Sequence, residues 1–170
     1  MNLVTRTTGQ PINVNSDAVR LAITPNGKTV YIDGSEHTVV PISTATNTAG
    51  KPIKAGSEPF FIAITPDGTT AYVASNAVYA ISTATGTARK VLQLARFTPM
   101  RIAITADGKT AWVSGIVSGK DGRIPHGVVV PISVPTGRAG QPINVGEIFP
   151  CLVTTPWRSG RTLGPSSCSA

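Results

Sequence analysis

The stretch IAITPDGTTAYV (62–73) decides the fold of this chain, because the sequence contains it three times. Near-copies are LAITPNGKTVYI at 21–32 and IAITADGKTAWV at 102–113. One glycine in the centre of each copy marks the period of 41 and 40 residues: Gly27, Gly68 and Gly108. A period near 40 with strand-like contents predicts a β-propeller and not a helical solenoid.

Each repeat unit predicts four strands joined by tight turns. Residues 62–65 and 70–73 alternate in polarity and are rich in β-formers, and Pro66-Asp67-Gly68 between them has the composition of a hairpin turn. A third strand is expected at 78–81 and a fourth at 89–94. The apolar IAIT strand would lie innermost in a four-stranded antiparallel meander, which is the blade of a propeller.

Four prolines occur in the third and fourth strands of the first and third units: Pro41, Pro52, Pro131 and Pro142. Proline has no N–H group to donate to a strand ladder. We therefore expect the strands that carry these prolines to lie near a sheet edge.

The block PISTATNTAGKPIKAGSEPFFIAITPDGTTAYV (41–73) resembles the YVTN-type β-propeller repeat family, which includes bacterial surface and exported proteins and relatives of propeller lactonases. The Tyr-Val-Thr-Asn signature is degraded here to YVAS at 72–75, YIDG at 31–34 and WVSG at 112–115. The resemblance implies a propeller fold and a location at the cell envelope or outside the cell. It brings no catalytic residues with it.

The blade count predicts an all-β fold of about three and a half blades, an incomplete or open propeller. One domain would span 1–170, with repeats at about 18–58, 59–98 and 99–149. A partial fourth blade would be formed by 1–17 and 150–164, followed by a tail at 165–170. Because a repeat buries its surface only against its neighbours, the end blades would expose apolar faces, and we expect self-association. The chain would then be cut from a larger family design.

Charge and composition limit the partners. Residues 1–85 hold five basic and five acidic side chains, whereas 86–170 hold ten and three, so the net charge of +7 arises in the second half. A basic face predicts attraction to a polyanion, but dispersed charge, few aromatics and the lack of a reader motif argue against specific nucleic-acid recognition. Phe97, Trp112 and Phe149 are expected to pack inside. No window approaches the roughly 18 apolar residues of a membrane-spanning helix.

The sequence does not determine the cellular compartment of the protein. The start MNLVTRTTGQPINV (1–14) lacks the apolar region of a signal peptide, as a mature exported form or a truncated gene would. Cys151 and Cys168 match no zinc or redox motif; they could pair if the protein is exported, or be one buried and one tail thiol.

Loops after the second and fourth strands of each blade would share one face of the molecule. The acids and histidines placed there are Asp17, Asp33, Glu36, His37, Glu58, Asp121, His126 and Glu147. Basic residues assigned to the opposite face are Arg6, Lys28, Lys51, Arg89, Lys90, Lys109 and Arg138. These groups could simply be solvated, or could line a ligand site. In the second case the long loop at 114–127 is the first place to look.

The candidate ligand-binding residues on that face are Glu36, His37, Glu58, Arg96, Asp121, Arg123 and His126. No metal or cofactor is predicted, because the histidines lack HxH or HExxH spacing and no DxDxDG loop is present.

Three functions compete. The first is a non-catalytic module that binds a ligand or protein, since no nucleophile motif or phosphate loop is present. The second is a lactonase-like hydrolase in which Glu36, His37, Glu58 and His126 activate water while Arg96 or Arg123 holds an anionic substrate. The third is a fragment without independent function.

Overall fold

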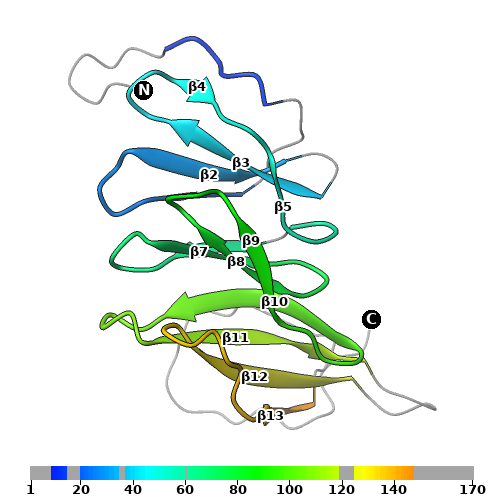
Figure 1. Cartoon of the computed structure of the whole chain (residues 1–170). Helices are drawn as coiled ribbons and strands as arrows, with labels where there is room; N and C mark the ends of the chain where they lie inside the picture. Colours follow the sequence, from blue (N-terminus) through cyan, green and yellow to red (C-terminus); the bar gives the residue numbers. More distant parts are fainter. Residues whose placement is uncertain (1–8, 15–19, 35–36, 60, 119–124, 148–170) are drawn as a thin grey trace, which may run out of the picture.

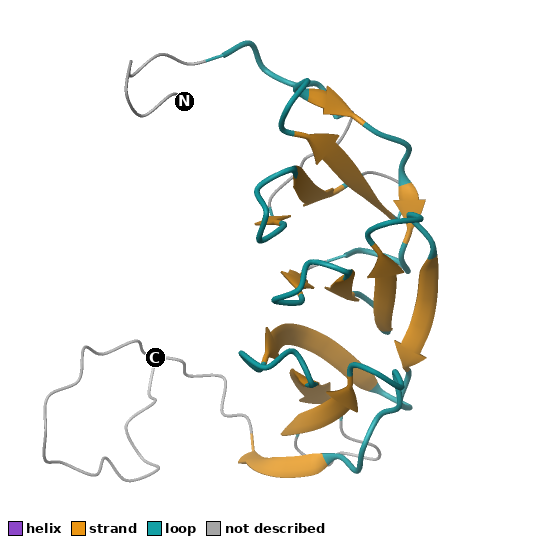
Figure 2. Cartoon of the chain, turned by 60° about the vertical axis from the view of Figure 1, so that its left-hand side comes forward, coloured by secondary structure: helices purple, strands orange, loops and turns teal. Residues whose placement is uncertain are grey.

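The computed structural model describes residues 9–14, 20–34, 37–59, 61–118 and 125–147. In these residues the chain forms thirteen strands and no helix, arranged in three antiparallel sheets (Figure 1). The sheets follow one another along a curve (Figure 2). The predicted all-β fold of propeller-type meanders in an open arc is confirmed.

The three sheets are named A, B and C in chain order. Sheet A contains β1 (Leu21–Ile23), β2 (Thr29–Asp33), β3 (Thr38–Ser43), β4 (Thr48–Ala49) and β5 (Ile53–Lys54). Sheet B contains β6 (Phe61–Ile64), β7 (Thr70–Ala74), β8 (Val78–Ser82) and β9 (Ala88–Leu92). Sheet C contains β10 (Phe97–Ile104), β11 (Thr110–Val117), β12 (His126–Ser133) and β13 (Ile143–Glu147). Contacts between sheets are made mainly by β1, β6 and β10, the strands formed by the repeated IAIT segments. The predicted fourth blade and tail fall largely on 1–8, 15–19 and 148–170, outside the described residues.

The core is formed by side chains packed between neighbouring sheets. Tyr31 and Val39 of sheet A are buried against Val73 and Ile81 of sheet B. On its other face sheet B buries a second set, which includes Tyr72, against sheet C. Sheet B is therefore apolar on both faces, as expected for a blade with a neighbour on each side.

A third apolar cluster covers the free face of sheet A. Ile32, Val40 and Ile42 are buried there, and Ile12 and Val14 from the start of the chain pack on them. The segment 9–14 thus covers part of a sheet face that has no preceding sheet among the described residues.

Pro41 and Pro131 lie, as expected, in strands near a sheet edge, because β3 and β12 are the neighbours of the outermost strands of their sheets. Pro41 lies in β3, which pairs with β2 on one side and with β4 and β5 on the other. Its carbonyl accepts a hydrogen bond of 2.7 Å from the Gly50 N–H. Because N–H and C=O of one residue point to the same side of an antiparallel strand, the missing donor also faces the outer strand. That strand is interrupted there, between β4 and β5.

Sheet C repeats this arrangement, whereas sheet B does not. The Pro131 carbonyl accepts a hydrogen bond of 2.7 Å from Gly140, where a single bridge precedes β13. A Cβ atom on Gly140 would lie 2.9 Å from the Pro131 ring, and one on Gly50 would lie 3.2 Å from the Pro41 ring. Glycine therefore fits opposite proline.

In sheet B the counterparts are Ala80 and Arg89, which are cross-strand partners. Alanine keeps its N–H group and leaves room for a long side chain opposite it. The outer strand β9 consequently runs without a break over Ala88–Leu92.

Two expectations differ from the structure. The predicted loop at 114–127 is strand at both of its ends, because β11 continues to Val117 and β12 starts at His126. Trp112, expected inside, is 38% exposed. It lies on the face of sheet C that points away from sheet B, since its neighbours Ala111 and Val113 face sheet B.

Replacement of Ala80 by proline should destabilise the fold by about 1–3 kcal/mol, because the ring removes a ladder hydrogen bond and meets the Arg89 stem. The double variant Ala80→Pro/Arg89→Gly should lose less free energy of unfolding than the sum of the single variants. Urea unfolding of the four proteins measures the coupling, with Ala80→Ser as a control that keeps the N–H. Strict additivity would contradict this account of the proline–glycine pairing.

Candidate functional site

The antiparallel sheets present two ends to solvent. The loops that join β2 to β3, β5 to β6, β7 to β8, β9 to β10 and β11 to β12 gather at one end, here called the loop face. The tight hairpins that join β1 to β2, β6 to β7 and β10 to β11 lie at the other end, the turn face (Figure 1). Each face carries a separate cavity.

Four of the seven predicted site residues lie in the described part of the loop face; Glu36, Asp121 and Arg123 fall outside it. His37 and Glu58 come together, because the Glu58 N–H donates a hydrogen bond of 3.3 Å to His37 Nδ1. Both residues have positive φ, 67° and 54°. Such backbone is uncommon for residues other than glycine and often accompanies functional loops.

Arg96 and His126 belong to sheet C and not to the His37–Glu58 pair. Arg96 also has a positive φ, 60°, and its carbonyl accepts a hydrogen bond of 2.9 Å from the Ser118 N–H. His126 starts β12, where it is the ladder partner of Val117. Within the described ranges, no three His, Cys, Asp or Glu side chains lie close enough together to share a metal ion.

A second group of loop-face residues was missed from the sequence. Arg20 directly precedes β1, Phe61 begins β6 and Arg101 lies within β10. These three residues line a cavity of about 250 Å³ with Leu21 and Ile62. The Arg101 guanidinium lies 5.4 Å from the centre of the Phe61 ring, a cation–π contact. The signal was present in the repeats, since all three occupy the position just before the IAIT-like strand.

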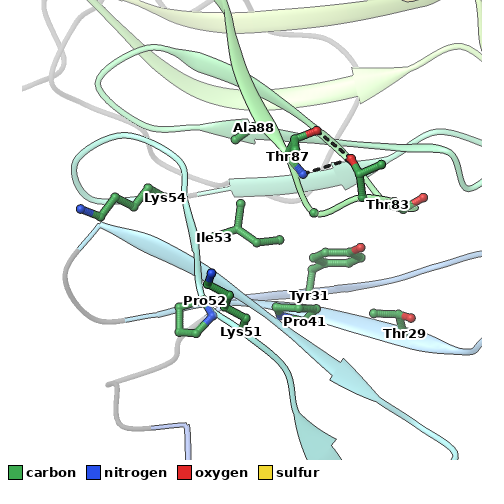
Figure 3. A pocket seen from close by; sticks show the side chains of 12 residues that line it. Thr29, Tyr31, Pro41, Lys51, Pro52, Ile53, Lys54, Thr83, Thr87 and Ala88 are labelled. Atoms are coloured by element: carbon green, nitrogen blue, oxygen red, sulfur yellow. Dashed lines mark hydrogen bonds between the residues drawn. The ribbon is translucent and has the colours of Figure 1, made fainter.

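The larger cavity, of about 580 Å³, opens between sheets A and B at the turn face (Figure 3). Its apolar wall includes Tyr31, Pro41 and Ile53. Lys51 and Lys54 lie at its margin, and both are exposed. None of the seven candidate ligand-binding residues lines this cavity, whereas Lys51 was predicted on the basic face.

The opposite wall of the larger cavity carries threonine hydroxyls. Thr83 donates a hydrogen bond of 2.7 Å to the Gly68 carbonyl, which holds it between two turns. The hydroxyls of Thr85 and Thr87 lie 2.7 Å apart and bond to each other. A hydroxyl has one hydrogen and two lone pairs, so each retains capacity for a ligand. None of the lining residues, all of them within the described ranges, carries a carboxylate.

The same space between sheets B and C is filled by Arg89. This residue takes the position that Gly50 has in sheet A, and its guanidinium lies in contact distance of a Cβ placed on Gly137. It lies near the buried Tyr72 hydroxyl, whose pKa is raised by burial and lowered to a lesser extent by the Arg89 charge. The open cavity thus exists because sheet A has glycine where sheet B has arginine.

Two acids with shifted pKa values, Asp67 and Asp107, act in the turns. The Thr65 hydroxyl and the Thr69 N–H bond the Asp67 carboxylate and lower its pKa. The pKa of Asp107 is lowered in the same way by Thr105 and the Lys109 N–H. A general acid at neutral pH needs a raised pKa instead. Asn26 makes the equivalent bonds in sheet A without a charge.

The lowered pKa values predict a pH dependence of stability. A carboxyl group whose pKa is lower in the folded chain stabilises it above the unfolded-state value of 3.8, and this contribution disappears as the pH falls through the folded value. The variant Asp67→Asn/Asp107→Asn, which copies the uncharged Asn26 turn of sheet A, should therefore show a smaller loss of urea midpoint between about pH 5 and pH 2. An equal loss in both proteins would contradict the assignment.

Comparison with known proteins identifies the fold. No protein-family model matches the chain, and no curated protein matches it. Hydrazine synthase of Kuenenia stuttgartiensis is 27% identical with a TM-score of 0.69, over 84% of this chain and 41% of that one. A Bacteroides fragilis protein proposed to be a 6-phosphogluconolactonase is 22% identical with a TM-score of 0.57, over 78% and 40% of the two chains.

TolB of Acinetobacter baumannii is 15% identical with a TM-score of 0.56, over 78% of this chain and 33% of that one. The chain spans about two fifths or less of the length of these structures. Among the described residues no helix is long and apolar enough to cross a membrane. The likenesses to propeller-type structures show that the three sheets are blades of a β-propeller fold.

Proposed function

We propose that this chain is a non-catalytic β-propeller module that binds an anionic, hydroxyl-rich polymer at its turn face. The observation that carries the proposal is the cavity between sheets A and B, which combines lysines, threonine hydroxyls and an apolar wall without a carboxylate among its lining residues. Its volume of about 580 Å³ lies within the range of small-ligand sites.

Each part of the lining suits one part of such a ligand. Threonine hydroxyls exchange hydrogen bonds with hydroxyl groups of a sugar-type unit. Tyr31, Pro41 and Ile53 offer apolar surface to its C–H groups. Lys51 and Lys54 attract its anionic groups, an attraction that salt weakens.

The overall charge and the repeat resemblance support the same assignment. The net charge of +7, which arises in residues 86–170, attracts polyanions to the molecule, and the cavity with Lys51 and Lys54 adds a shaped site to this general attraction. The likeness of 41–73 to YVTN-type repeats supports a position at the cell envelope or outside the cell, where acidic wall polymers are found.

The cavity can be closed by giving sheet A the residues of sheet B. In the variant Pro41→Ala/Gly50→Arg the guanidinium should occupy the cavity as Arg89 occupies its counterpart. We expect affinity for polygalacturonate, measured by isothermal titration calorimetry, to fall at least about tenfold, or ~1.4 kcal/mol. Neutral dextran should not compete.

A matched control is Lys109→Ala, which removes one charge from the turn face in the β10–β11 hairpin, away from the cavity. This control should change affinity only slightly. Unchanged or tighter binding in Pro41→Ala/Gly50→Arg, which adds one positive charge, would show that charge alone holds the polymer and that the cavity is not the site. Equal losses in the two variants would show that the loss is not specific to the cavity.

A second candidate, a lactonase-like hydrolase, is favoured by the contact between Glu58 and His37 on the loop face. Arg20 and Arg101 beside Phe61 offer anchors for an anionic substrate in place of the arginines nominated from the sequence. The solved structure proposed to be a 6-phosphogluconolactonase shares the fold at 22% identity.

Hydrolysis of 6-phosphogluconolactone, followed by pH-stat above its spontaneous rate, tests this candidate. If it holds, His37→Ala should lower the rate by about 10²–10⁴-fold, as expected for loss of a general base. The cavity variant Pro41→Ala/Gly50→Arg should keep full activity, which separates the two functions. A rate equal to the spontaneous one in the unmodified protein excludes the hydrolase.

A further inference from the structure

Every sheet has a forward face, directed toward the next sheet, and a rear face, directed toward the preceding one. The forward faces of the three sheets carry matching cross-strand triplets. In sheet A, Tyr31 lies between Ala22 and Pro41 in the ladder. The same places hold Ala63, Tyr72 and Ala80 in sheet B, and Ala103, Trp112 and Pro131 in sheet C.

The central aromatic residues of the three triplets differ in burial. Tyr31 is 2% exposed and Tyr72 is 0% exposed, because sheets B and C cover them, whereas Trp112 is 38% exposed. Ile143 repeats the pattern, being 48% exposed where Ile53 in the corresponding place of sheet A is 9% exposed. The forward face of sheet C therefore resembles the forward faces of sheets A and B, each of which is covered by the rear face of the next sheet.

The rear face of sheet A shows the complementary difference. Ile62 and Ile102 face the preceding sheet and are 7% and 5% exposed, whereas their counterpart Leu21 is 69% exposed. Ile23 in the same strand is 53% exposed. The rear face of sheet A therefore has apolar residues at the positions where the rear faces of sheets B and C pack against the forward face of the preceding sheet.

One occupant of the rear face of sheet A is already visible. The segment GQPINV at 9–14 is identical to GQPINV at 140–145, which contains the start of β13 in sheet C. Ile12 and Val14 of the first copy pack against Ile32, Val40 and Ile42 on that rear face. The rear face of sheet A therefore binds, within the chain, the same hexapeptide that sheet C presents beside Trp112.

We propose that the forward face of sheet C in one copy docks on the rear face of sheet A in a second copy. Trp112 of the first copy then takes the place that Tyr31 and Tyr72 have between sheets, and β13 of the first copy replaces segment 9–14 of the second copy. The contact joins two different faces, so it is heterologous and either closes a ring or extends a filament. Two copies joined at both ends contain six sheets, within the four to eight blades of closed propellers.

Single substitutions that block one face each test the polarity of the contact. Leu21→Arg places a charge on the rear face of sheet A, and Trp112→Arg places one on the forward face of sheet C. By size-exclusion chromatography with light scattering, each variant alone should be monomeric at concentrations where the unmodified chain associates. A mixture of the two should form a 1:1 complex, because it retains one intact face of each kind.

Trp112 also reports the contact directly. In a Trp157→Phe background it is the only tryptophan of the chain, and its emission should shift to shorter wavelength as association buries the indole. The variant Ile12→Ser/Val14→Ser should associate at lower concentration, because segment 9–14 no longer competes for the rear face. Circular dichroism checks that each variant is folded, and Ile143→Arg replaces Trp112→Arg if the latter is not.

Three results would overturn the proposal. The first is a monomer at all concentrations in both the unmodified chain and Ile12→Ser/Val14→Ser. The second is association of Leu21→Arg alone, which would show contact between two forward faces. The third is a mixture of folded Leu21→Arg and Trp112→Arg that stays monomeric.

Discussion

The packing of one sheet's forward face on the next sheet's rear face is the contact on which the rest of the structure depends. Tyr31 and Tyr72 lie at the centre of the two such contacts and are almost fully buried. A four-stranded sheet with two apolar faces cannot bury both by itself, so each blade is stable only beside a neighbour. Because this stacking keeps the three sheets in one orientation, the β1–β2, β6–β7 and β10–β11 hairpins lie together at the turn face.

A small difference between repeats controls what lies between the blades. Pro41 with Gly50 interrupts the outer strand and leaves a cavity, whereas Ala80 with Arg89 keeps the strand continuous and fills the corresponding space. The scaffold tolerates both solutions because the change lies at the outer edge, away from the inner strands that make the contacts between sheets. Binding capacity can therefore change from blade to blade without loss of the fold.

Much of the fold could be predicted from the repeats, but much of the site could not. The alternation in IAIT and the turn at Asp67 act over a few residues, so their local sequence was sufficient to place strands and hairpins. The cavity lined by Tyr31 and Thr83 joins residues 52 positions apart in two sheets, and no short pattern marks it. Trp112 looked like a core residue because its type and strand suggested packing, and only the absence of a following sheet in the described residues exposes it.

The sequence by itself determined the repeat period, the strands, the hairpins stabilised by Asp67, Asp107 and Asn26, and the likeness of the three blades, since these depend on neighbours along the chain. Only the tertiary structure decided which faces are covered, where Arg89 fills a space and where Gly50 leaves one, and that Arg20, Phe61 and Arg101 meet. The physical reason is that burial and cavities arise between blades about 40 residues apart in the sequence. The alternation of side chains along a strand shows which residues share a face, but it does not show which other sheet covers that face.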